Sequence, residues 1–241
     1  MLQQLRRAAE GSVLETQPHY RTAIGVLGVT LPPILIVAWL LLVSKTETSI
    51  SAYYYTQMRD WFVGTLWVIG VFLFFYRYRP RQPGQARSSR KSVQTGAADS
   101  WLGKVAGLCA VVVALVPTTP PPESKDVPPT IGALHGVAAA ILFLCLALFP
   151  LLLFSQSRSR SRVYRGYGWT MIVLLLLTVA YAFAPTGLKA STATLRPILV
   201  LETLLIVVFG VSWFDKGREL AAATVGATRP TQQGAEADEA Q

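Results

Sequence analysis

Two ionisable side chains, His135 and Glu202, lie well inside long apolar stretches of this sequence. An acid or an imidazole in hydrocarbon costs a few kcal/mol unless it faces a partner or a cavity, so both residues are candidates for function. Together they could serve as a general acid and base, exchange a proton during transport, or hold the polar head of a ligand. Whether they act together depends on the elements that position them.

The apolar stretches predict an all-α, polytopic membrane protein. The chain has 241 residues, of which 52% are hydrophobic, and a mean hydropathy of +0.42, which is too apolar for an ordinary soluble domain. A spanning helix needs roughly 20 mostly apolar residues, and the stretches lack the alternation of a barrel strand. Six transmembrane helices are expected, at residues 22–44, 60–76, 101–117, 131–154, 169–183 and 197–214.

The basic residues predict the orientation of these helices. Seventeen of the 22 Lys and Arg residues fall in the N-terminus, in the second loop and the start of the third helix, in the fourth loop and in the tail. Five fall in the alternate loops. The positive-inside rule then predicts both termini in the cytoplasm, in a cell inner membrane. Residues 1–21 would be a cytoplasmic N-terminal segment, and residues 215–241 a cytoplasmic flexible tail. Orientation accounts for the net charge of +9, so no nucleic-acid partner is expected.

The six-helix topology places the two buried ionisable residues at a similar depth. At about 1.5 Å per residue, His135 lies roughly 6 Å and Glu202 roughly 8–10 Å below the outer ends of their helices. Polar residues of the first outer loop, the second helix and the fifth helix can reach the same layer, which predicts an outward-facing polar pocket. The candidate ligand-binding residues are Glu202, His135, Asp60, Arg59, Tyr53, Tyr54, Tyr55, Ser51 and Tyr181.

Each candidate also has a structural interpretation. His135 could simply bond to a neighbouring helix, Glu202 could be paired within the protein, and the three consecutive tyrosines suit an aromatic belt at the interface. A metal site is not expected, because the sequence lacks a second nearby histidine and a cysteine pair. No Walker sequence, dinucleotide fingerprint or nucleophile elbow indicates a cofactor or a known hydrolase.

These patterns favour a protein of non-enzymatic or regulatory role whose pocket binds a lipid or small amphiphile. A membrane-embedded lipid hydrolase that uses Ser51, and a proton-coupled small-molecule transporter, are the alternatives. Membrane lipids are the expected partners, and the Arg-rich loops could hold anionic headgroups; a homo-oligomer is left open. Small residues spaced four apart, among them Gly103 with Gly107 and Gly132 with Gly136, predict a tight hairpin of the third and fourth helices.

One stretch of the sequence resembles a known set of proteins. The segment Ser49–Gly64, followed by Ala106-Gly107, Pro117 and His135-Gly136, is similar to uncharacterised bacterial six-helix membrane proteins, whose layout is similar to that of DRAM-like proteins. DRAM-like proteins usually carry Ile-Ser-Asp after the first helix, whereas here Ala52 follows Ile50-Ser51. The resemblance covers about residues 22 to 214. It implies six helices and a site at the outer face, without a settled activity.

Overall fold

The computed structural model describes residues 2–76, 90–119, 128–157 and 159–228, and in these ranges every regular element is a helix. The α-helices are α1 (Leu2–Val43), α2 (Arg59–Phe74), α3 (Arg90–Leu115), α4 (Pro129–Leu148), α5 (Ser161–Ala182), α6 (Thr186–Thr192) and α7 (Pro197–Thr228). Short elements join them: the 3-10 helices η1 (Ser51–Tyr55), η3 (Phe154–Gln156) and η4 (Ala193–Leu195), and the π-helix η2 (Phe149–Leu153). The predicted all-α class is confirmed.

Four helical stretches in the described residues are long and apolar enough to cross a membrane: Pro18–Val43, Pro129–Gln156, Ser161–Ala182 and Pro197–Ala223. The chain is therefore a membrane protein. The apolar part of α3, Ser100–Leu115, is shorter, and α2 has 16 residues. Six spans, like the orientation of the termini, stay predictions.

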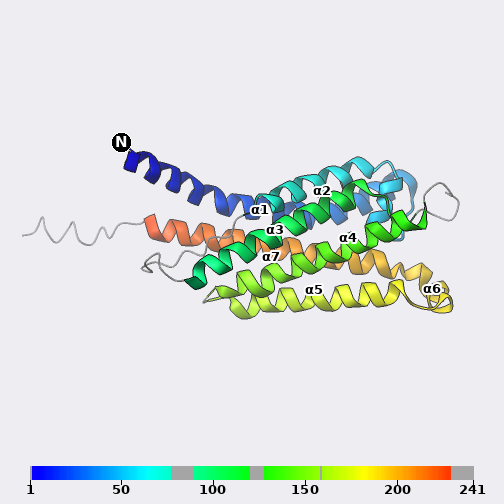
Figure 1. Ribbon diagram of the computed structural model, residues 1–241. Coiled ribbons are helices and arrows are strands. Elements are labelled where there is room, and N and C mark those ends of the chain that lie inside the picture. Colours follow the sequence, from blue (N-terminus) through cyan, green and yellow to red (C-terminus); the bar gives the residue numbers. More distant parts are fainter. Residues whose placement is uncertain (1, 77–89, 120–127, 158, 229–241) are drawn as a thin grey trace, which may run out of the picture.

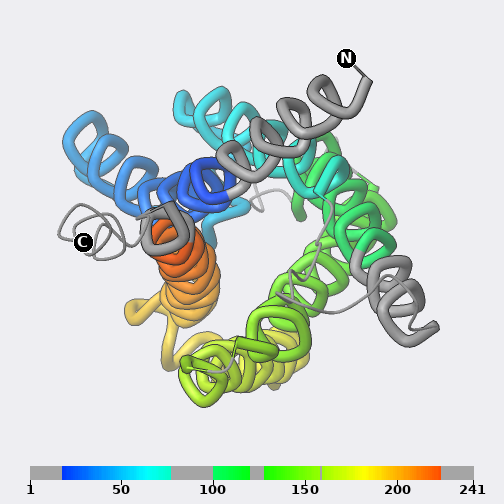
Figure 2. The backbone as a smooth tube through the Cα atoms, turned by 90° about the vertical axis from the view of Figure 1, so that its left-hand side faces the viewer, coloured from blue at the N-terminus to red at the C-terminus, as the bar shows by residue number. Residues whose placement is uncertain are grey.

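The long helices run side by side and close into a ring. Each of α1, α2, α3, α4 and α5 packs on the long helix that follows it, and α7 packs on α1; the ring is visible in the view along the helices (Figure 2). Figure 1 shows α1 beginning and α7 ending at one end of the bundle, the terminal end, and η1 and α6 at the other, the loop end. Long helices that follow one another along the chain thus lie next to one another in the ring, as is usual in helix bundles.

Glycines set the closest approaches in the ring. A Cβ added at Gly25 of α1 would lie 2.7 Å from the Gly210 carbonyl oxygen of α7, and one added at Gly210 would lie 2.6 Å from the Val29 nitrogen. On the other side, a Cβ at Gly107 of α3 would lie 2.7 Å from the Phe74 nitrogen at the end of α2. Only glycine allows backbones this close. The predicted stripe on the third helix thus faces α2, and Gly136 on α4 has open space beside it, although α3 and α4 are neighbours.

Several helices extend beyond the ends that hydropathy indicates. The last helix continues past Phe214 to Thr228, and the first begins at Leu2 instead of residue 22. The added residues are mostly good helix formers such as Leu, Gln, Arg, Ala and Glu. The helix therefore continues beyond the apolar stretch, and α1 runs on through Pro18. Residues 229–241, the rest of the expected tail, lie outside the described residues. The predicted fourth helix, 131–154, ends as an α-helix at Leu148 and continues as η2, which contains Pro150.

An aromatic cluster fills the ring towards the terminal end. Trp213 of α7 is fully buried, and its ring centroid lies 5.1 Å from those of Tyr76 and Phe149 and 5.3 Å from that of Phe154. Phe209, one turn earlier on α7, packs on Trp213 at 5.9 Å. Such edge-on contacts are worth about 0.5–1.5 kcal/mol each beyond the area they bury. The cluster is continuous with the wall of the cavity described next.

Candidate functional site

An apolar cavity lies inside the ring, bounded by α1, η1, α2, α3, α4 and α7. The space between its walls, counted together with the part that is open to the outside, is about 550 Å³. Its walls are aliphatic and phenylalanine side chains, such as Leu66, Leu142 and Phe209, and its polar lining residues are Ser51 and Glu202. Glu202 and Phe209 are seven residues apart on α7, so the cavity extends roughly 10 Å along the bundle axis.

Glu202 joins α7 to the loop that follows α1. Its Oε2 accepts a hydrogen bond from the Ile50 backbone nitrogen at 2.7 Å and a longer one from that of Ser51 at 3.4 Å. These two N–H groups begin η1, where helical N–H groups have no partner within the helix and where a negative charge is favourable. Within the described residues Oε1 has no hydrogen-bond partner. The carboxylate therefore has one oxygen engaged by the backbone and one available towards the cavity that it lines.

Local hydrogen bonds shape the loop around η1. The Ser49 hydroxyl accepts from the Ala52 nitrogen at 3.0 Å, and the Thr56 hydroxyl donates to the Tyr53 carbonyl oxygen at 2.8 Å. Both are short-range bonds typical of Ser and Thr in turns. They fix the backbone that presents the Ile50 and Ser51 N–H groups to Glu202.

Two of the three tyrosines bond η1 to the end of α3, and none of the three lines the cavity. Tyr54 and Tyr55 donate to the carbonyl oxygens of Leu115 and Thr118, at 3.3 and 2.6 Å, at the end of α3. Tyr53 is fully buried, and burial raises the pKa of its hydroxyl, which stays protonated at neutral pH. The sequence analysis assigned these tyrosines to a pocket, whereas in the structure two of them attach the loop to the end of α3.

Arg59 and Asp60 are exposed at the start of α2. The Arg59 guanidinium donates to the Tyr54 hydroxyl at 3.0 Å and lies 4.6 Å from the Tyr54 ring centroid. Tyr181 bonds to the Thr192 hydroxyl at 2.7 Å, which links α5 to α6. The structure does not bring these three residues to the cavity.

His135 lies on α4 and is also not a lining residue. It is 2% exposed, and its Nδ1 lies 2.6 Å from the carbonyl oxygen of Val116, directly after α3. The last carbonyl groups of a helix have no N–H donor within the helix, and the His135 ring provides one for the carbonyl of Val116. The bond requires a hydrogen on Nδ1 of His135. The structure brings Glu202 and Ser51 together at the cavity and places His135 in a contact between α3 and α4.

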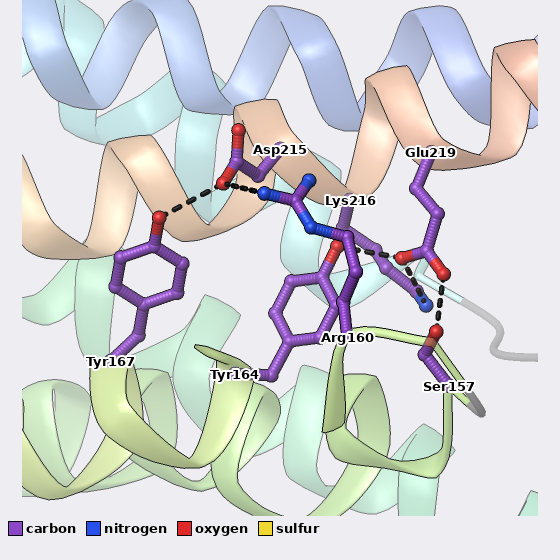
Figure 3. A network of polar contacts seen from close by, with 7 residues as sticks. All are labelled: Ser157, Arg160, Tyr164, Tyr167, Asp215, Lys216 and Glu219. Atoms are coloured by element: carbon purple, nitrogen blue, oxygen red, sulfur yellow. Dashed lines mark hydrogen bonds and ion pairs between the residues drawn. The ribbon is translucent and has the colours of Figure 1, made fainter. Parts of the chain in front are cut away.

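A second polar group, which the sequence analysis missed, joins α7 to α5 at the terminal end (Figure 3). Asp215 accepts from Tyr167 at 2.9 Å and from Arg160 at 3.3 Å. Glu219 accepts from Tyr164 at 2.7 Å, from Lys216 at 3.0 Å, and from the hydroxyl of Ser157. We call these seven residues the α5–α7 network.

The sequence did not indicate the α5–α7 network, because the last helix was predicted to end at Phe214. Asp215 and Glu219 are four residues apart, a spacing that puts both on one helix face once the helix is known to continue. Lys216 is 4% exposed and its ammonium pairs with Glu219. Because both carboxylates already have donors, the network is suited to holding two helices together. In the described residues no group of His, Cys, Asp and Glu could hold a metal ion.

Comparisons with known proteins return one match. A family model described as "Protein of unknown function (DUF998)" matches residues 22–213, which is nearly the whole helical region of the resemblance noted above. No curated protein and no solved structure matches the chain. Nothing in these comparisons bears on the DRAM-like layout.

Proposed function

The chain belongs to the DUF998 family, whose function is unknown, and we propose that this membrane protein binds a lipid or small amphiphile in a non-enzymatic or regulatory role. The observation that carries the proposal is the interior cavity, whose walls are apolar and whose polar lining residues are Glu202 and Ser51. An amphiphile has the same division into an apolar tail and a polar head. Binding pockets are typically concave and apolar with a few placed polar groups.

The hydrolase alternative has less support. A serine nucleophile needs a base within hydrogen-bond reach of its hydroxyl. Ser51 offers its backbone N–H to Glu202, and His135 is engaged with Val116. A transporter would need Glu202 to face both sides of the membrane in turn, whereas its hydrogen bonds to the Ile50 and Ser51 N–H groups hold it at the loop end.

The proposal includes six spanning helices with both termini in the cytoplasm of a cell whose inner membrane holds the protein. The loop end would then face outwards. Thr48, near η1, and Ser159, before α5, are both exposed. In a variant without the native Cys109 and Cys145, an impermeant maleimide applied to intact cells should label Thr48→Cys, whereas Ser159→Cys should need permeabilised cells. The opposite pattern would reverse the orientation.

A cavity-filling substitution tests the binding role. Ala139 of α4 lines the cavity, whereas Ala133 of the same helix is exposed and does not. Native mass spectrometry of gently solubilised protein should detect an amphiphile on the wild type and on Ala133→Phe, and should detect it no longer on Ala139→Phe. Equal retention by both variants would contradict a ligand in this cavity. Circular dichroism melts of the two variants control for folding.

The Arg-rich segment at the terminal end supports lipid contact of a second kind. Arg162 and Arg165 of α5 are exposed, and each could contribute about 1 kcal/mol towards anionic headgroups. This contact would orient the protein without forming the cavity site.

A further inference from the structure

Glu202 has no counter-ion in the described residues. The ion pairs found there join Arg160 to Asp215 and Lys216 to Glu219, and both lie at the terminal end, outside the cavity. Glu202 instead stands within an apolar spanning helix, five residues after Pro197. Buried charges in proteins are normally paired, because an unpaired charge in a medium of low polarity is costly.

The backbone provides hydrogen-bond donors to one of the two oxygens of this carboxylate. The N–H groups of Ile50 and Ser51 both reach Oε2, which leaves the lone pairs of Oε1 for a donor in the cavity. An ionised carboxylate is an acceptor only. The group that completes it must therefore bring hydrogen-bond donors, and a positive charge would bind it more tightly than a neutral donor.

The remaining walls exclude a second charge. Beyond Glu202 and Ser51 the lining consists of hydrocarbon side chains down to Phe209, so a ligand with an additional anionic group near its tail would be poorly accommodated. The distance of roughly 10 Å from Glu202 to Phe209 suits one short apolar tail.

From this arrangement we propose that the cavity takes an amphiphile with a primary ammonium head, which donates to Oε1 of Glu202 while its tail lies against Leu66, Leu142 and Phe209. The inference rests on the proposed function and adds the chemical class of the head. A primary ammonium is carried by free alkylamines and by aminophospholipids alike. The apolar walls favour the free alkylamine, because the phosphate of an aminophospholipid would have to lie outside them.

Three probes with the same eight-carbon tail test the head group: octylamine, octanol and octanoate. Their affinities would be measured by isothermal titration calorimetry on the full chain in nanodiscs at pH 7, with Ala139→Phe nanodiscs as the baseline for partition into lipid. Octylamine should bind the wild type at least about tenfold more tightly than octanol, as expected for a hydrogen bond to a charged group. Octanoate should bind more weakly than either.

The variant Glu202→Gln keeps the size of the side chain and an oxygen for the Ile50 N–H. It should reduce the octylamine preference to less than about threefold while octanol still binds, which shows that the cavity is intact. If this variant does not fold, the comparison of octylamine with octanol in the wild type decides alone. Competition by lysophosphatidylethanolamine distinguishes the two sources: displacement of octylamine indicates an aminophospholipid, and its absence a free amine.

The two proposals fail differently. Equal affinities for octylamine and octanol in the wild type, both lost in Ala139→Phe, would overturn the ammonium head and leave the amphiphile cavity standing. A preference for octylamine that persists in Glu202→Gln would also overturn it. Binding of none of the probes above the Ala139→Phe baseline would overturn the proposed function together with the inference.

Discussion

Replacing Glu219 with glutamine should destabilise the protein substantially, although the two side chains have nearly the same shape. Glu219 accepts hydrogen bonds from Ser157, Tyr164 and Lys216. A glutamine offers one acceptor oxygen, and its amide nitrogen would face a donor of the network. At least one donor then loses its partner, and the ammonium of Lys216, which is 4% exposed, loses its counter-charge.

The magnitude follows from two routes that agree. Polar contacts between membrane helices are worth about 0.6 kcal/mol on average and at most about 1.7, so the two contacts that Glu219 makes outside α7, with Ser157 and Tyr164, give about 1–3 kcal/mol. Removing one partner of a buried ion pair typically costs about 3–5 kcal/mol. We take about 3 kcal/mol. For a chain of this length that lowers the melting temperature by about 6–12 °C.

The matched control is Arg160→Gln. Arg160 belongs to the same network, but its side chain is 41% exposed in its pair with Asp215, and exposed pairs contribute about 0–1 kcal/mol. Melting in detergent, followed by circular dichroism, should therefore show a drop of a few degrees at most for Arg160→Gln.

A second substitution separates charge from packing. Adding Lys216→Met to Glu219→Gln removes the unpaired ammonium and should recover part of the lost melting temperature. A loss in Glu219→Gln no larger than that in Arg160→Gln, or no recovery in the double variant, would refute the assignment of Lys216 and Glu219 as a buried pair.

Two further substitutions probe the ring. Gly25→Ala should cost about 2–3 kcal/mol, because its Cβ would meet the Gly210 carbonyl oxygen at 2.7 Å, whereas Gly136→Ala, with open space beside it, should be neutral or gain up to about 1 kcal/mol; equal melting temperatures would contradict the close approach of α1 and α7. His135→Leu should cost about 1–3 kcal/mol, because the Val116 carbonyl oxygen loses its donor, and should leave octylamine affinity in nanodiscs unchanged; a large loss of affinity would return His135 to the binding site.

The sequence predicts the helical class, and its candidate residues include both polar residues that line the cavity, Glu202 and Ser51. Apolar stretches of spanning length can only be helices in a membrane, and the structure confirms the class. Glu202 is identified because a carboxylate within an apolar helix needs a partner. Its actual partners are backbone N–H groups of Ile50 and Ser51, and backbone groups leave no mark on side-chain patterns.

The sequence could not predict which helices and side chains pack on one another. The stripe containing Gly107 indicates a close neighbour, but it is equally suited to the helix before it and the helix after it, and the structure selects α2. Similar depth placed His135 with Glu202, yet depth says nothing about which way a helix is rotated about its axis. Hydropathy also ended the last helix at Phe214, which removed Asp215 and Glu219 from consideration.

The contact of Gly25 with Gly210 has a consequence for biogenesis. The two glycines belong to the first and last long helices, so a ribosome that makes the chain from its N-terminus delivers the partner of Gly25 after all the other long helices have begun. Until then the face of α1 that carries Gly25 lacks its partner helix. The ring is closed by the last helix, and the cavity acquires Glu202 in the same step. In a chain truncated before Gly210 the ring would stay open, and the proteases that degrade misfolded membrane proteins would meet an incomplete bundle.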